Sequence, residues 1–158
     1  MATTSPHYLQ SHYINPASLM ELKVLSQVVT QMQQQGNVKG SIPYLAKICQ
    51  IVDNQQTQDK KKTALDPVRA QAHAQLADAY FKTQQWVQCE ASLTLAVKIW
   101  EKDRDSNATS LAHAYDQLIP CYETLGKQKM AEYMEQRKAK LMVASSSSSP
   151  PPEPSTSS

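Results

Sequence analysis

Apolar residues recur three or four positions apart through most of this chain, which is the spacing of one face of an α-helix. Ser18 and Glu21 have the Ser-x-x-Glu spacing of a helix-capping box, and Gly36 stands where a left-handed C-terminal cap would lie. Between them runs the first apolar stripe, made of Leu22, Leu25, Val28, Val29 and Met32. The pattern predicts a helix over about 19–35.

A second helix is expected soon after Gly36 and Gly40. Ser41 can cap it, and Pro43 would then stand in the first turn, where its missing N–H costs little. The apolar stripe of this helix consists of Tyr44, Leu45, Ile48 and Ile51. The following stretch DNQQTQDKKKT contains no apolar residue, and we interpret 53–66 as a linker between helical pairs.

Four more helices follow from the same pattern. Asp66 as N-cap and Pro67 as first helical residue open a third helix that runs to about Thr83, and a fourth is expected over roughly 86–102. Pro120 falls inside the fifth, so that helix either bends or is replaced by a new one near Pro120. The stripes of the fifth and sixth helices are Leu111, Tyr115, Leu118 and Tyr122, then Met130, Tyr133, Met134 and Leu141.

Both ends of the sequence lack this pattern. Residues 1–17 carry few apolar positions and are expected to form a flexible leader. At the other end, 145–158 reads SSSSSPPPEPSTSS after Ala144, and ordering it would cost backbone entropy with no large apolar side chain to bury. The folded domain is therefore predicted to cover 18–144, with a disordered tail after it.

Charge and cysteine content narrow the class of partner. Lys and Arg number 16 against 14 Asp and Glu, which is too balanced for a nucleic-acid partner, and no apolar run is long enough to insert into a membrane. The three cysteines stand at helical apolar positions, as buried reduced thiols do, and favour a reducing compartment. We expect a cytoplasmic protein. The run Lys60-Lys61-Lys62 leaves nuclear import open, although a solvated loop is the simpler interpretation.

Self-comparison indicates a repeat. Leu76 and Tyr80 stand four apart, as Leu118 and Tyr122 do 42 residues later. The segment that holds the first pair resembles the tetratricopeptide repeat in the order and spacing of Leu76, Ala77, Tyr80, Trp86, Cys89, Leu93 and Ala96. In the same frame the third hairpin supplies Tyr115, Leu118, Tyr122, Gly126 and Ala131, and the first supplies Leu25, Val28, Val29, Met32, Gly36, Ser41, Leu45 and Ile48.

The resemblance implies an all-α protein in which three helix-turn-helix hairpins, at about 19–52, 67–102 and 108–143, stack as a short right-handed α-solenoid. Repeat steps of 48 and 42 residues exceed the usual ~34 and are similar to the longer repeats of kinesin light chains. His73 and Glu101 depart from the family pattern, where an aromatic residue and a proline are usual.

Proteins of this family bind partners in a concave groove formed by the first helix of each hairpin. The resemblance therefore implies a non-enzymatic scaffold or adaptor that holds a peptide or helix of another protein. Carried over position by position, the groove would consist of Lys23, Ser26, Thr30 and Gln33, then Gln71, Asp78, Phe81 and Lys82, then His113, Asp116 and Glu123.

The last helix offers a second kind of interface. No seventh helix follows to cover the stripe of Met130, Met134 and Leu141, so a partner or a second copy could dock there. The alternative function is thus a small structural subunit of a larger complex, with a cytoskeletal or ciliary setting favoured only by the kinesin-light-chain likeness. Which partner, which process and which oligomeric state apply is left open by the sequence.

Catalytic chemistry is not indicated. The sequence has no Gly-rich phosphate loop and no acid–base pair at plausible spacing, so we expect neither an enzyme nor a bound cofactor. His73 and His113 lie in different repeats without a Cys or carboxylate at ligand spacing, and a metal site is not expected.

Overall fold

The computed structural model of the protein describes residues 14–56 and 64–146. They form six α-helices: α1 (Pro16–Gln34), α2 (Val38–Gln56), α3 (Asp66–Lys82), α4 (Trp86–Trp100), α5 (Ala108–Thr124) and α6 (Gln128–Ser146), with a short 3-10 helix, η2 (Glu101–Asp103), after α4. The described residues contain no strand, so the predicted all-α class is confirmed. The sixth helix extends to Ser146, two residues into the segment predicted as tail. The rest of that segment and most of the predicted leader and linker lie outside the described residues.

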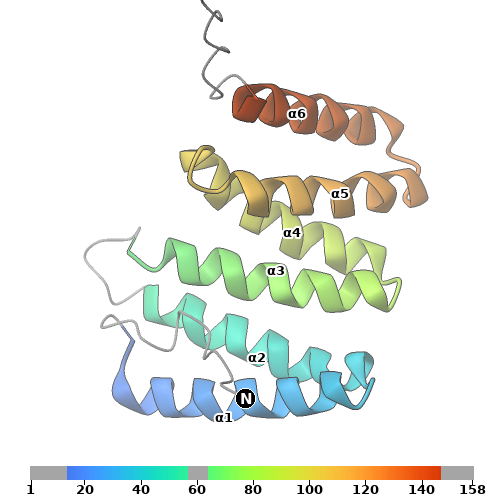
Figure 1. Ribbon diagram of the computed structural model, residues 1–158. Helices are drawn as coiled ribbons and strands as arrows, with labels where there is room; N and C mark the ends of the chain where they lie inside the picture. Colours follow the sequence, from blue (N-terminus) through green and yellow to red (C-terminus); the bar gives the residue numbers. More distant parts are fainter. Residues whose placement is uncertain (1–13, 57–63, 147–158) are drawn as a thin grey trace, which may run out of the picture.

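The helices pack in chain order. Figure 1 shows that α1, α3 and α5 run one way and α2, α4 and α6 the other. Each helix contacts the next one along the chain, and α3 also contacts α5. Within the described residues, no helix is long and apolar enough to cross a membrane.

The turns inside the three helical hairpins are built alike. Each passes through one residue with positive φ: Gly36 (77°), Gln84 (60°) and Gly126 (75°). That residue donates its N–H to the carbonyl three positions back, and the next residue donates to the carbonyl five positions back, at 2.8 Å in all three turns. This is the pattern of a Schellman-type helix end. The turns lie 48 and 42 residues apart, which are the spacings of the sequence repeat.

Two buried clusters form the core, and α3 belongs to both. The first cluster joins α1, α2 and α3 through residues such as Leu22, Leu45 and Leu76, and the second joins α3, α4, α5 and α6. The alanines of α3 divide between the clusters: Ala70 and Ala77 face the second, and Ala72 and Ala79 the first. Small side chains on both faces let neighbouring helices approach α3 closely.

The first helix begins earlier than predicted, and its cap differs. Asn15, rather than Ser18, is the N-cap: its Oδ1 accepts from the N–H of Ala17 at 2.9 Å, and Pro16 opens the helix. The predicted capping box therefore does not form. Ile14, which we had assigned to the flexible leader, is buried in the first cluster, so the folded part begins before residue 18.

The start of α2 also corrects the prediction. This helix begins at Val38, where Asn37 Oδ1 accepts from the N–H of Gly40 at 2.9 Å. Ser41 is therefore a residue of the helix and not its cap, and its buried hydroxyl donates to the carbonyl of Val38 at 2.6 Å. At its other end α2 extends to Gln56, into the segment predicted as linker.

In the later helices the differences are smaller. The N-cap of α3 is Leu65, so Asp66 stands in the first turn, where it pairs with Nζ of Lys102 at 3.0 Å. The fourth helix ends at Trp100 and continues as η2. Pro120 lies inside α5, which continues through it to Thr124. The alternative that a new helix starts near Pro120 is therefore wrong.

Two polar side chains of α3 bind one carboxylate of α2. Asp53 of α2 accepts from Nε of Arg69 at 2.9 Å, and its other oxygen lies 3.0 Å from Nε2 of His73. Burial alone would raise the pKa of Asp53, but the hydrogen bonds from His73 and Arg69 outweigh it and lower that pKa. His73 thus links α3 to α2.

A second polar cluster joins α5 and α6 to the end of α4. Tyr115 is fully buried, and its hydroxyl donates to Oε1 of Glu101 at 2.7 Å. Arg137 of α6 lies 2.8 Å from the same oxygen. Burial, and then the neighbouring Glu101 carboxylate, raise the pKa of Tyr115. Glu101 supplies the acceptor for both neighbours.

Candidate functional site

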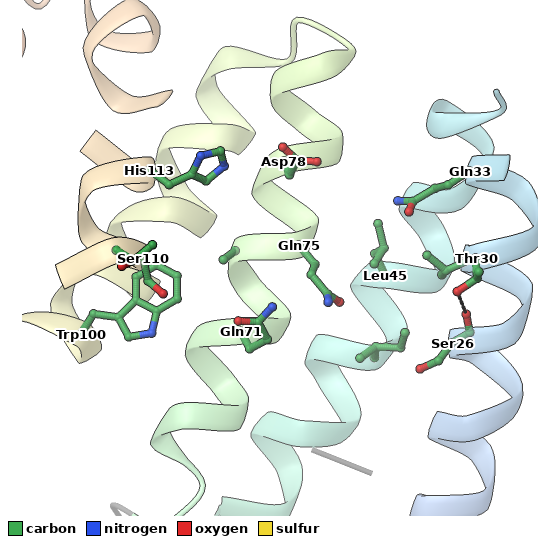
Figure 2. A pocket seen from close by; sticks show the side chains of 14 residues that line it. Ser26, Thr30, Gln33, Leu45, Gln71, Gln75, Asp78, Trp100, Ser110 and His113 are labelled. Carbon is green, nitrogen blue, oxygen red and sulfur yellow. Dashed lines mark hydrogen bonds between the residues drawn. The ribbon is translucent and has the colours of Figure 1, made fainter. Parts of the chain in front are cut away.

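A hollow of about 470 Å³ lies along one side of the helices (Figure 2). Its walls come from the odd-numbered helices, with Ser26, Val29, Thr30 and Gln33 of α1, Gln71, Ala74, Gln75 and Asp78 of α3, and Thr109, Ser110 and His113 of α5. The even-numbered helices contribute Leu45, Ile48 and Trp100. These three residues and Val29 are buried and therefore form the bottom, whereas the polar residues line the sides.

Six of the eleven residues proposed for the groove line this hollow: Ser26, Thr30, Gln33, Gln71, Asp78 and His113. They come from three different helices and are separated by up to 87 positions in the sequence. The structure therefore brings these six residues together on one hollow. The other five, Lys23, Phe81, Lys82, Asp116 and Glu123, are not among the lining residues.

Phe81 contributes to packing and does not line the hollow. Its ring is half-buried and meets Trp86 edge to face, with ring centroids 5.4 Å apart and an interplanar angle of 85°. It packs against the second core cluster. Our assignment of Phe81 as a groove residue is therefore corrected, because its side chain helps to close the turn between α3 and α4.

The charged residues near the hollow are paired within the protein. Asp78 accepts from Nε2 of Gln117 at 2.9 Å through one oxygen and pairs with Nζ of Lys82 at 2.9 Å through the other. Asp116 pairs with Lys138 of α6. Among the lining residues, Asp78 is the only Asp, Glu, Lys or Arg, and its charge is offset by Lys82.

Uncharged polar groups dominate the walls. Within the described part of the chain, the side-chain amides of Gln33, Gln71 and Gln75 make no hydrogen bond to the protein. Each amide offers a donor and an acceptor, which is the pair that a peptide backbone presents. Thr30 donates its hydroxyl to the carbonyl of Ser26 at 2.9 Å (Figure 2), so its oxygen remains an acceptor.

Sequence reasoning missed eight lining residues, and several of them, such as Gln75, had a usable signal. Gln75 follows Gln71 by one helical turn and precedes Asp78 by another, so it shares their face. The apolar bottom was harder to find. Leu45, Ile48 and Trp100 belong to the second helices of their hairpins, and their spacing marked them as core, which they also are.

The predicted docking stripe on the last helix is exposed at only one of its three residues. Met134 and Leu141 are each only 7% exposed and belong to the second core cluster, packed in the interface that α6 forms with α5. Met130 is 40% exposed. The stripe was read as uncovered because no helix follows it, but the same face is the one that α5 covers. This prediction is wrong for two of its three residues.

The groups that could perform chemistry are far apart or buried. His73 binds Asp53 and His113 lines the hollow, so the two histidines do not meet. Among the described residues, no three His, Cys, Asp or Glu side chains are grouped so that they could hold a metal ion. All three cysteines are free and buried, as predicted, and burial raises the pKa of Cys49 and Cys89 to about 12.

Comparison with known proteins gives no family. No protein-family description matches the chain, and neither a curated protein nor a solved structure matches it.

Proposed function

We propose that this protein is a tetratricopeptide-like scaffold or adaptor whose hollow binds an extended, uncharged segment of another protein. In this proposal the three hairpins stack as a short right-handed α-solenoid, and its concave side is the hollow. The observation that carries the proposal is the lining: side chains from α1, α3 and α5 converge on one space although they are distant in sequence.

Burial along the second hairpin supports the family assignment. Leu76, Cys89 and Leu93, which matched the repeat pattern, are buried, and so are the small residues Ala77 and Ala96. The repeat pattern needs small residues at these positions because the two helices of a hairpin cross there. The shared turn geometry at Gly36, Gln84 and Gly126 supports a threefold repeat in the same way.

The chemistry of the lining favours an extended peptide. Gln33, Gln71 and Gln75 stand on two facing helices and can pair with the N–H and C=O groups of a chain laid between them. Leu45 and Ile48 at the bottom would receive an apolar side chain. A strongly charged peptide would find no counter-charge, because Asp78 is already paired with Lys82.

The alternative of a structural subunit that docks through its last helix is not favoured. Met134 and Leu141 are buried against the protein's own core, so the surface that this alternative needs is absent at those residues. The same burial removes the argument for a homodimer formed through that stripe.

A peptide-display selection tests the proposal without knowledge of the natural partner. Random peptides would be selected on the full-length chain, and enriched sequences measured by fluorescence anisotropy. Gln71→Arg places a bulky cation in the hollow and should weaken binding at least ~10-fold, a difference of about 1.4 kcal/mol. Gln88→Arg is the matched control, because Gln88 is exposed on α4 and does not line the hollow.

Two results would count against the hollow as the binding site. One is a selection that enriches no peptide, and the other is a set of peptides that bind Gln71→Arg as tightly as the unchanged chain. Circular dichroism of both variants would show that each still folds. Enriched peptides should also be poor in Lys, Arg, Asp and Glu.

A further inference from the structure

Two of the three cysteines meet at the interface of the second and third hairpins. Cys89 lies in the first turn of α4 and Cys121 in the last turn of α5. Both belong to the second core cluster, where α4 packs against α5. Cys121 Sγ also lies 3.1 Å from the carbonyl oxygen of Trp86, one turn before Cys89. Both cysteines are fully buried in the second core cluster.

The third cysteine cannot take part in this contact. Cys49 lies in α2 and belongs to the first core cluster, with α3 between it and the other two. Three cysteines allow three different disulfides, but a disulfide needs Cα atoms within about 7 Å of each other. Of the three cysteines, only Cys89 and Cys121 share a core cluster, on helices that pack against each other, so the fold favours their pairing.

We propose that Cys89 and Cys121 form a redox-sensitive pair that a small-molecule disulfide, such as oxidised glutathione, converts into an intramolecular disulfide between α4 and α5. This modification would tie the third hairpin to the second covalently. Trp100 of α4 and His113 of α5 both line the hollow, so the bond would also fix two of its parts relative to each other.

The reaction balances as two thiol–disulfide exchanges. In the first, the Cys121 thiol loses its proton and its sulfur attacks one sulfur of glutathione disulfide, which releases one glutathione thiolate. In the second, the Cys89 sulfur, after losing its proton, attacks Sγ of Cys121 and releases the second glutathione. The two protein thiols lose two electrons in total, and the glutathione disulfide gains them.

The order of attack follows from the surroundings of the two thiols. Burial raises the pKa of both, and that of Cys89 to about 12. The charge of Glu90 adds to this for Cys121, whereas the hydrogen bond from Cys89 and the positive charge of Lys127 act in the opposite direction. Cys121 is thus the sulfur that is better able to ionise. Because neither thiol is exposed, exchange requires α5 and α6 to open from α4.

The test uses the full-length chain. It would be unfolded in urea, refolded in a buffer of oxidised and reduced glutathione, quenched with acid, and analysed by mass spectrometry and peptide mapping. Refolding through the unfolded state removes the barrier that burial imposes, so the folded structure alone selects the product. We expect a loss of two hydrogen masses, a bond between Cys89 and Cys121, and one remaining thiol.

Three variants make the outcome specific. Cys49→Ala should still form the bond, whereas Cys89→Ala and Cys121→Ala should not form it. The oxidised chain should melt at a Tm higher by something on the order of 10 °C, because the bond constrains the unfolded chain. The proposal is overturned if three free thiols remain, if Cys49 forms the main disulfide, or if the product is a stable glutathione adduct or a covalent dimer.

Discussion

The hairpin turns allow a stringent test, because one of three equivalent positions carries an unfavourable residue. Gly36 and Gly126 adopt positive φ without a side chain, but Gln84 does so with one, at 60°. An L-residue in this region costs about 1–2 kcal/mol, since Cβ approaches the carbonyl oxygen. Replacing Gln84 with glycine would remove this cost. Glycine loses more conformational freedom on folding, however, and this loss offsets ~0.5–1 kcal/mol of the stabilisation. We therefore expect Gln84→Gly to stabilise the protein by about 0.5–1 kcal/mol.

Replacing glycine with alanine at the two other turns should destabilise the protein. At Gly36 and at Gly126 an added Cβ would meet no atom within 4 Å. The cost of Gly36→Ala or Gly126→Ala is then conformational only, and we expect each to lower stability by about 0.5–1 kcal/mol. Gln88→Gly is the control for glycine itself, because Gln88 is exposed within α4 and should lose about 1 kcal/mol.

Urea unfolding followed by circular dichroism measures all four variants. The midpoint should shift while the slope stays constant, because no contact surface changes. If Gln84→Gly unfolds at the same urea concentration as the unchanged chain or at a lower one, the repeated-turn argument is refuted. The same holds if Gly36→Ala and Gly126→Ala leave the midpoint unchanged.

Three further predictions concern the core and its ion pairs. Asp53→Asn should cost about 1–2 kcal/mol at pH 7. Because the folded pKa of Asp53 is depressed, this contribution is present above the unfolded value of about 3.9 and lost as pH falls through the folded one, so the two melting curves should converge in acid. The control Asp105→Asn, at an exposed loop residue, should change neither the stability at pH 7 nor its dependence on pH. Tyr115→Phe should cost about 1–2 kcal/mol in urea unfolding, since it removes the buried bond at 2.7 Å. Met134→Asp should prevent stable folding, whereas Met130→Asp should be tolerated, as thermal melts would show; equal effects would contradict the assigned faces of α6.

The fold was predictable where a residue's surroundings lie within its own helix. Stripes such as Leu111, Leu118 and Tyr122 recur at helical spacing and are all buried. Helix starts were less predictable, because several nearby residues could serve as a cap. Ser18 and Asn15 compete for the first helix, and Asn15 forms the cap while its N–H donates to Gln55 of α2, 40 residues away. A sequence pattern that covers only a few neighbouring residues cannot predict this long-range contact.

The candidate site shows the same division. Gln33, Gln71 and His113 had been assigned to one surface on the tetratricopeptide resemblance, and all three line the hollow. That Cys89 and Cys121 share a core cluster could not be foreseen, since it depends on how α4 packs against α5. The burial of Met134 was missed for a related reason: an apolar stripe shows that a face is covered, but not by which helix.

Because α3 belongs to both core clusters, the protein should not unfold as a uniform whole. Each cluster is built from neighbouring helices, so loops of short sequence separation close first and folding should be fast. Hydrogen exchange should then be slowest in α3 and faster towards α1 and α6, as in a one-dimensional chain of coupled units. The bottom of the hollow takes Leu45 from one cluster and Trp100 from the other. Opening at either end would therefore dismantle it, and a bound peptide would slow exchange in both halves at once.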